Sequence, residues 1–399
     1  MQNHFLLKIL KLEEYVIEKI EEKGKEFYVY CRPRKRGMWH ENQYSEALST
    51  TRIKTARHMV IEDAVAVLKI KQRKFYFKKY DKRLWEQLPD FKKKKRDSNT
   101  FRGNTLKNLR NTNYTGASEN RSTSKMFPLR LLDEIGGLKI NWRSDCRRIG
   151  LDGKGIRKSK AVMNITNLDA REVISVLPAY NQETLEEWCK TLTEEQRLQI
   201  TEICVDMSDV PISIIKKYFP KARIVIDQFH VIQNAIKLMD DHRCLIQQMD
   251  RVKIPVKYEL AKPIHKLKQE EYDKMEPLLK QHLTLKCFWK TLHRLRKIYW
   301  QKNYRKARSQ LRYVIWLCEQ NGIPEMETLA KTLRKWFDEI LNYYISKTTN
   351  AYTEGIHTKF ELIKRHHFGV RNLERFSKRL LFCLTPLVVF SELLSNFVK

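Results

Sequence analysis

Three acidic residues in this chain of 399 residues stand where carboxylates can bind metal ions and do chemistry. Asp152 and Asp206 each end an apolar run, and Glu354 follows the polar stretch 346–350 at the expected start of a helix. Oxygen ligands suit Mg²⁺, and two such ions can activate the attacking oxygen and stabilise the leaving oxygen in phosphodiester displacement. An aspartate such as Asp152, taken alone, is more often a turn or cap residue. The three carboxylates together favour a metal site.

Two apolar runs, 203–205 and 224–226, end at Asp206 and Asp227. The segment between these runs has apolar residues at helical spacing, at Ile212, Ile215 and Phe219. This pattern predicts a strand, a helix and a strand, with the two strands parallel and buried. Both aspartates are then expected at the carboxyl ends of strands, where open α/β sheets bind their ligands.

The segment before these strands predicts the rest of a mixed sheet. Apolar runs at 149–152, 161–166 and 172–177 predict three further strands, and 183–192 has the composition of a helix. Three strands, a helix and then strand–helix–strand is the order of a ribonuclease-H-like α/β fold, whereas a doubly wound fold alternates from the start. The glycines of 150–155 form no P-loop, because isoleucine follows the last of them where a P-loop needs lysine.

The amino-terminal part of the chain differs in composition. Residues 1–89 are expected to form a small β-rich module, with a hairpin over 14–31 and strands within 52–80. Residues 90–144 are expected to hold a basic linker and a helix-turn-helix, which the pattern of 105–135 predicts as two short helices.

The catalytic domain is expected in two pieces. Its first part covers 145–231, its carboxyl-terminal helices cover 346–399, and an all-helical insertion covers 232–345. The insertion is rich in Leu, Lys, Arg and Glu and poor in glycine, which is typical of long helices. Four of its tryptophans are expected to pack between helices rather than to stack on bases: Trp289, Trp300, Trp316 and Trp336.

A formal net charge of +31 is the strongest compositional feature and indicates a polyanionic partner, with nucleic acid ahead of membranes. The alternative is an organism whose proteins are basic in general, but the charge is clustered. One cluster can be a flexible joint, a set of phosphate contacts or both: Lys92, Lys93, Lys94, Lys95 and Arg96. The eight cysteines include no CxxC pair, and residues 1–12 do not resemble a signal peptide. We therefore expect a cytoplasmic, nucleoid-associated protein.

Three motifs resemble a group of bacterial insertion-sequence DDE transposases. They are VDM at 205–207, FPKARIVIDQFHV at 219–231 and NAYTEGIHTKFELIKRHHFGVRNLERF at 350–376. Members of this group have a zinc-ribbon and helix-turn-helix amino terminus before a ribonuclease-H-like catalytic domain. The resemblance implies that Asp152, Asp206 and Glu354 are the metal-binding catalytic triad. It also implies DNA cleavage at element ends, transfer of the 3′-hydroxyl into target DNA, two Mg²⁺ or Mn²⁺ ions, and a homodimer acting on double-stranded DNA.

The same resemblance extends to residues around the triad. Asp227 and His230 match the Asp-x-Phe-His motif, with a supporting role or a structural capping role equally open. The basic end of the last motif is matched by four residues that could contact phosphates or form a solvated helix face: Lys364, Arg365, Arg371 and Asn372.

The chain departs from the family pattern at three positions. Cys31 alone remains of the paired cysteines of the ribbon, so a structural zinc ion is not expected. Gly153 stands where an acidic residue is usual, and His357 stands where asparagine is usual. Two other functions stay open: a relative that binds DNA without cutting it, and a ribonuclease-H-like nuclease without strand transfer.

Overall fold

The computed structural model describes residues 2–61, 64–91, 96–119, 123–124, 126–134, 142–157, 160–366, 372–386 and 389–391. These residues form two compact units. One contains residues 1–141 together with 362–399, and the other contains residues 142–361. Two segments predicted from the sequence to contact DNA, Lys92–Lys95 and Arg371, lie outside the described residues.

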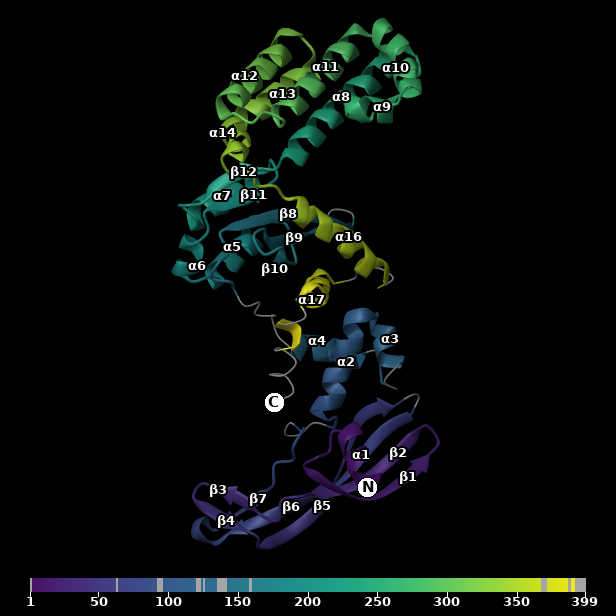
Figure 1. Cartoon of the computed structure of the whole chain (residues 1–399), viewed down its shortest axis with the longest axis vertical. Coiled ribbons are helices and arrows are strands. Elements are labelled where there is room, and N and C mark those ends of the chain that lie inside the picture. Colours follow the sequence, from purple (N-terminus) through teal and green to yellow (C-terminus); the bar gives the residue numbers. More distant parts are fainter. Residues whose placement is uncertain are drawn as a thin grey trace. The chain divides into compact units, whose positions relative to one another are not determined.

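The first unit is built on a β-sheet with strand order β1-β2-β6-β5, and β7 pairs with β6 (Figure 1). Its elements are α1 (Gln2–Ile9), β1 (Tyr15–Lys23), β2 (Glu26–Pro33), β3 (Met38–His40), β4 (Gln43–Ser45), β5 (Leu48–Ile61), β6 (Ala64–Phe77), η1 (Lys78–Tyr80) and β7 (Lys82–Trp85). The hairpin expected over 14–31 is β1–β2, which turns at Gly24, a glycine with a positive φ of 61°. The strands expected within 52–80 belong to β5 and β6. Cys31 is buried in the core of this sheet.

Helices complete the first unit: α2 (Asn99–Asn111), α3 (Tyr114–Glu119), α4 (Met126–Glu134) and α17 (Leu373–Leu384). The expectation of two helices in 105–135 is therefore wrong, because three occur in and around that range. The helix α2 ends at Asn111, and a new helix begins at Tyr114. The Asn113 side chain accepts a hydrogen bond from the Gly116 backbone in the first turn of α3. Leu106, Leu131 and Phe382 bring α2, α4 and α17 into one small core.

The second unit contains a mixed sheet with strand order β10-β9-β8-β11-β12. Its strands are β8 (Arg148–Arg157), β9 (Lys160–Asn167), β10 (Glu172–Leu177), β11 (Glu202–Val205) and β12 (Arg223–Ile226). The flanking helices before β12 are α5 (Gln182–Thr191), α6 (Glu194–Leu198) and α7 (Asp209–Tyr218). Strands β8, β11 and β12 are parallel to one another, while β9 runs antiparallel to both of its neighbours, β8 and β10. The predicted mixed α/β architecture and the parallel strand–helix–strand unit are confirmed.

One expectation about this sheet is wrong, because Asp152 does not end a strand. Strand β8 continues to Arg157 through its antiparallel pairing with β9, while its parallel pairing with β11 reaches only Gly150. The apolar run ends at Asp152, but the backbone pairing of β8 with β9 continues beyond it to Arg157. Asp152 thus lies beyond the last β8–β11 pair, at the same end of the sheet as the residues that follow β11 and β12.

The elements that follow β12, over residues 228–346, are helical, and they join the sheet through a continuous apolar core. They are α8 (Gln228–Asp250), α9 (Lys257–Ala261), η2 (Ile264–Lys266), α10 (Gln269–Gln281), α11 (Leu283–Ile298), α12 (Tyr304–Gln320), α13 (Pro324–Lys335), α14 (Phe337–Leu341) and α15 (Tyr343–Ser346). Figure 1 shows α8 leaving β12 for this helical bundle, and α16 (Ala351–His366) returning alongside β8. None of the described helices is long and apolar enough to cross a bilayer.

The tryptophans of the insertion divide into two classes. Trp289 and Trp336 are buried between helices, as expected. Trp300 and Trp316 are 62% and 51% exposed, so the expectation that they pack between helices is wrong. Trp316 instead stacks on Tyr313 at a ring-centroid distance of 5.7 Å. Helical spacing alone does not distinguish an inner from an outer aromatic residue on a helix as basic as α12.

Candidate active site

The acidic residues predicted from the sequence come from four elements around the carboxyl ends of the parallel strands. Asp206 directly follows β11, Asp227 directly follows β12, and Glu354 lies in the first turn of α16. Asp152 lies in β8 at 3% exposure, and Asp227 is 2% exposed. Two short parallel strands that end side by side bring Asp206 and Asp227 to the same edge, as their spacing in the sequence predicts.

Two histidines face Asp152 from different helices. The Nε2 atom of His230, in the first turn of α8, is 3.8 Å from Asp152 Oδ1. The Nδ1 atom of His357, one turn after Glu354 in α16, is 3.7 Å from Asp152 Oδ2. Both separations are ion-pair distances rather than hydrogen bonds. Asp152 is therefore flanked by imidazoles on both sides.

Crowding of these groups shifts their protonation. Burial, together with the charges of Asp227 and Asp152, raises the pKa of Glu354 from 4.5 to about 7. Burial also raises the pKa of Asp206 and that of Asp227, with the Asp152 charge adding to both. Burial alone would lower the pKa of His230, but the neighbouring carboxylates outweigh it and raise that pKa above its usual value. The edge therefore holds more negative charge than its protein partners neutralise.

Asn350, fully buried, links the start of α16 to the sheet. Its side-chain Nδ2 donates to Leu151 O at 3.0 Å and to Cys204 O at 3.3 Å, which joins β8 and β11. Its backbone N–H donates to Asp227 Oδ1 at 3.1 Å. The Glu354 N–H in turn donates to Asn350 O at 2.9 Å. One residue thus fixes Glu354 relative to the strands that carry Asp152, Asp206 and Asp227.

Two glycines make room for the residues that orient these carboxylates. A Cβ atom on Gly150 would lie 2.3 Å from Asn350 Oδ1 and 2.6 Å from Thr353 Oγ1, so a side chain there would displace the buried amide. A Cβ atom on Gly153 would lie 2.7 Å from the ring of Tyr180. The Tyr180 hydroxyl donates a 2.9 Å hydrogen bond to Asp206 Oδ1. The glycine at 153, where an acidic residue is usual, is therefore compatible with a tyrosine that holds Asp206.

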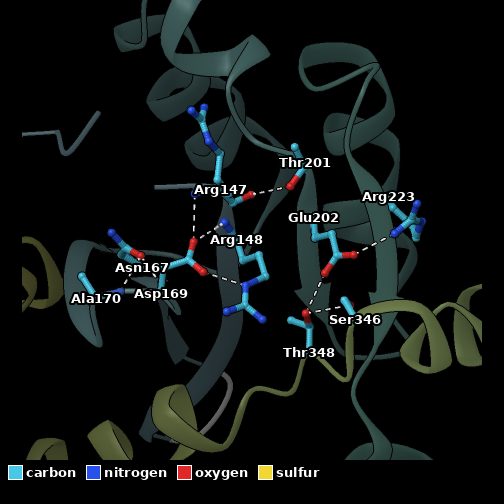
Figure 2. A network of polar contacts seen from close by, with 10 residues as sticks. All are labelled: Arg147, Arg148, Asn167, Asp169, Ala170, Thr201, Glu202, Arg223, Ser346 and Thr348. Carbon is cyan, nitrogen blue, oxygen red and sulfur yellow. Dashed lines mark hydrogen bonds and ion pairs between the residues drawn. The ribbon is translucent and has the colours of Figure 1, made fainter. Parts of the chain in front are cut away.

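At the other end of the same sheet, near the amino ends of the parallel strands, the acidic side chains are paired with arginines (Figure 2). Asp169 accepts hydrogen bonds from the backbone of Arg147 and Arg148 and from the Arg148 side chain, at 2.6–2.9 Å. Glu202, which begins β11, accepts from Arg223 at 2.8 Å and from Thr348 at 2.6 Å. These contacts hold together the amino ends of β8, β11 and β12, and they hold the segment that leads into α16.

The residues predicted to contact DNA are spread over other elements. Lys364 and Arg365 lie in the last turn of α16. Asn372 caps α17, where its side-chain oxygen accepts a hydrogen bond from Arg375 N at 2.9 Å. Arg96 is exposed just before α2.

Sequence comparison places this site in a known family. The profile of a transposase family matches residues 149–380, which is more than half of the chain. The name of this family refers to the ISL3 group and to DDE chemistry. The chain belongs to this transposase family. The matched range contains Asp152, Asp206, Asp227 and Glu354.

The chain is also similar to the transposase for insertion sequence element IS1001 of Bordetella parapertussis, to which it is 23% identical over 215 residues. The alignment covers 52% of this chain and 53% of that transposase, so the chain spans about half the length of this relative. The resemblance to insertion-sequence DDE transposases inferred from the motifs is thereby confirmed.

Sequence analysis of this family member missed two residues at the site, Tyr180 and Asn350. Tyr180 follows β10 in a loop with no motif, and its partner Asp206 is 26 residues away. Asn350 was included only as the first letter of a motif, although a polar residue just before a helix is a recognisable capping signal. Its bonds to strands 146 and 199 residues away could not be read from that signal.

Proposed function

We propose that this chain cleaves DNA at the ends of an insertion sequence and transfers the resulting 3′-hydroxyl into target DNA, with Asp152, Asp206 and Glu354 as the catalytic, metal-binding residues. The observation that carries the proposal is the crowding of carboxylates at the carboxyl ends of the parallel strands in a transposase-family chain, where burial, with the charge of Asp152 added, raises the pKa of both Asp206 and Glu354. The order of the five-stranded sheet supports a ribonuclease-H-like catalytic domain.

Divalent cations fit this donor set. Most of the donor atoms are carboxylate oxygens, and the carboxylates outnumber the cationic side chains near them. Glu354 Oε1 is also buried without a hydrogen-bond partner among the described residues. When bound, Mg²⁺ or Mn²⁺ supplies charge stabilisation for the attacking and leaving oxygens of phosphodiester displacement. The chain's own part is to hold its carboxylates in place: Tyr180 orients Asp206, and Asn350 orients Glu354.

DNA is the expected substrate and partner. The net charge of +31 favours binding to a polyanion, and the basic residues Lys364 and Arg365 continue the helix that carries Glu354. We propose that two copies of the chain act together on double-stranded DNA, as the family resemblance implies.

The test uses the full chain and a DNA fragment that carries the inverted repeats flanking its gene. With Mg²⁺ or Mn²⁺, the wild type is expected to nick at the repeat ends and to form strand-transfer products, while Asp206→Asn binds the DNA without cutting it. Asp209→Asn is the matched control, because Asp209 is exposed at the start of α7. Binding without cleavage by the wild type would overturn the proposal in favour of a DNA-binding relative. Sequence-independent cutting without strand transfer would favour a nuclease.

A further inference from the structure

The carboxyl edge of the sheet has a second set of donor atoms beside the proposed triad. One donor atom from each of Asp227, His230 and Glu354 lies within 4.8 Å of the other two. These residues come from the end of β12, the first turn of α8 and the first turn of α16. Because α8 starts where β12 ends, Asp227 and His230 are placed on one turn of chain, and Asn350 brings Glu354 to them.

Two of these three side chains have a buried polar atom without a hydrogen-bond partner in the described part of the chain, although His230 Nε2 lies at ion-pair distance from Asp152. His230 Nε2 and Glu354 Oε1 accept or donate no hydrogen bond among the described residues, although both atoms are shielded from solvent. A buried polar atom without a hydrogen-bond partner is costly, and in native proteins such an atom commonly contacts a bound water or ion. Asp227 is only 2% exposed, so water hydrates its carboxylate poorly.

We propose that Asp227, His230 and Glu354 bind one divalent cation, so that one metal position of this site has an imidazole nitrogen ligand. Imidazole binds Mn²⁺, Co²⁺ and Zn²⁺ more readily than it binds Mg²⁺, which prefers an all-oxygen shell. The cation at this position is therefore a first-row transition-metal ion such as Mn²⁺ rather than Mg²⁺. Asp152, 3.8 Å from His230 Nε2, borders the same position on the other side.

This inference rests on the proposed function, because it names the class of cation that the same site uses. It concerns ligands rather than turnover, so it can be measured without DNA. Its failure and that of the proposed function are then separate results. Nitrogen ligation without DNA cleavage would leave the ligand set standing, whereas cleavage with an oxygen-only cation shell would leave only the proposed function standing.

The first measurement needs no substitution. The full chain is freed of metal, loaded with one equivalent of Mn²⁺ and examined by pulsed electron paramagnetic resonance for coupling to nitrogen. Labelling the protein with ¹⁵N-histidine is expected to change the modulation pattern, as it must if an imidazole binds the ion. A spectrum that does not respond to the label would overturn the inference.

Two matched histidine variants assign the ligand. His230→Asn is expected to lose the nitrogen coupling and to weaken Mn²⁺ binding by at least the roughly 10–100-fold that loss of an outer-shell partner costs. Its Mg²⁺ affinity, measured by titration calorimetry, is expected to change less. His357→Asn is the control, because His357 is as close to Asp152 but lies outside the donor set. Nitrogen coupling that survives in His230→Asn and disappears in His357→Asn would contradict the assignment.

Discussion

The two ends of the five-stranded sheet carry acidic residues in opposite states. At the amino ends of the strands, Asp169 and Glu202 are held by arginines and a threonine in short hydrogen bonds (Figure 2). At the carboxyl ends, Asp227 is buried and Asp206 is half-buried among other carboxylates. Hydrogen bonds from Arg147 and Arg148 outweigh burial and lower the pKa of Asp169. Burial and like charges raise the pKa of Asp206, Asp227 and Glu354.

This difference separates stability from function within one sheet. Paired charges at the amino ends fix strands β8, β11 and β12 and the approach to α16. Crowded carboxylates at the carboxyl ends cost folding free energy unless a cation neutralises them. The comparison therefore predicts that substitutions at one end change stability, while substitutions at the other change cation binding and catalysis.

The largest effect is expected at the carboxyl end. Asp206→Asn should lower the rate of metal-dependent DNA cleavage by about a thousandfold or more, since the loss of several kcal/mol of charge stabilisation corresponds to that factor. Its metal-free stability should be unchanged or higher, because one of several repelling charges is removed. Cleavage assays and urea unfolding measure the two effects. A variant that cleaves normally, or that loses cleavage only because it unfolds, would break the comparison.

The next largest effect is expected where Asn350 joins the two strands to α16. Asn350→Ala leaves Leu151 O and Cys204 O without their donor, which should lower the free energy of unfolding by about 2–3 kcal/mol. Mn²⁺ affinity should fall as well, because Glu354 loses its anchor. Urea unfolding and calorimetry at a temperature where the variant is folded separate these effects. A loss of stability with unchanged Mn²⁺ affinity would mean that Asn350 supports the fold alone.

A change at the amino end should affect stability only. Glu202→Ala removes the buried acceptor of the Thr348 hydroxyl and of the Arg223 side chain, which leaves Thr348 only its contact with Ser346, at a cost of about 1–2 kcal/mol. Glu195→Ala, at an exposed position in α6, is the control and should change stability by no more than about 0.5 kcal/mol. Chemical unfolding compares the two variants. Mn²⁺ affinity should stay at the wild-type value in both, and a large loss in Glu202→Ala would contradict the separation.

The smallest effect is a pH dependence of opposite sign at the two ends. Glu354 binds its proton more tightly in the folded chain, so its contribution lowers metal-free stability as pH rises from 4.5 to about 7. Asp169, whose pKa is lowered on folding, contributes stability that is present above 3.8 and is lost as pH falls further. Unfolding measured across this range should lose the first slope in Glu354→Gln and the second in Asp169→Asn.

Cation binding should follow the same proton. Because Glu354 and His230 must both lose a proton to bind a cation, apparent Mn²⁺ affinity should rise with pH and level off only above the raised pKa of each, which for Glu354 is about 7. Calorimetry in buffers of different ionisation heat should detect proton release at pH 6. Affinity that is constant between pH 5.5 and 8 would show that Glu354 is not a ligand or is already ionised.

Much of this arrangement could be predicted from the sequence, because the signals are local. The apolar runs before Asp206 and Asp227 predict two parallel strands, and the polar segment before Glu354 predicts a helix start. Asp152 was misplaced relative to its strand, because pairing with β9 continues through residues whose side chains do not alternate like a strand. The contacts of Tyr180 and Asn350 are long-range, and no local pattern encodes which backbone oxygen a buried amide will reach.

The central claim is that divalent cations bind at the carboxyl end of this sheet and nowhere on its amino end. Anomalous diffraction from crystals of the full chain soaked in Mn²⁺ tests it most directly, because it locates the ion without reference to activity. The account predicts anomalous peaks among Asp152, Asp206 and Glu354, with no peak beside Asp169 or Glu202. Saturating Mn²⁺ that leaves the carboxyl end without a peak would contradict it.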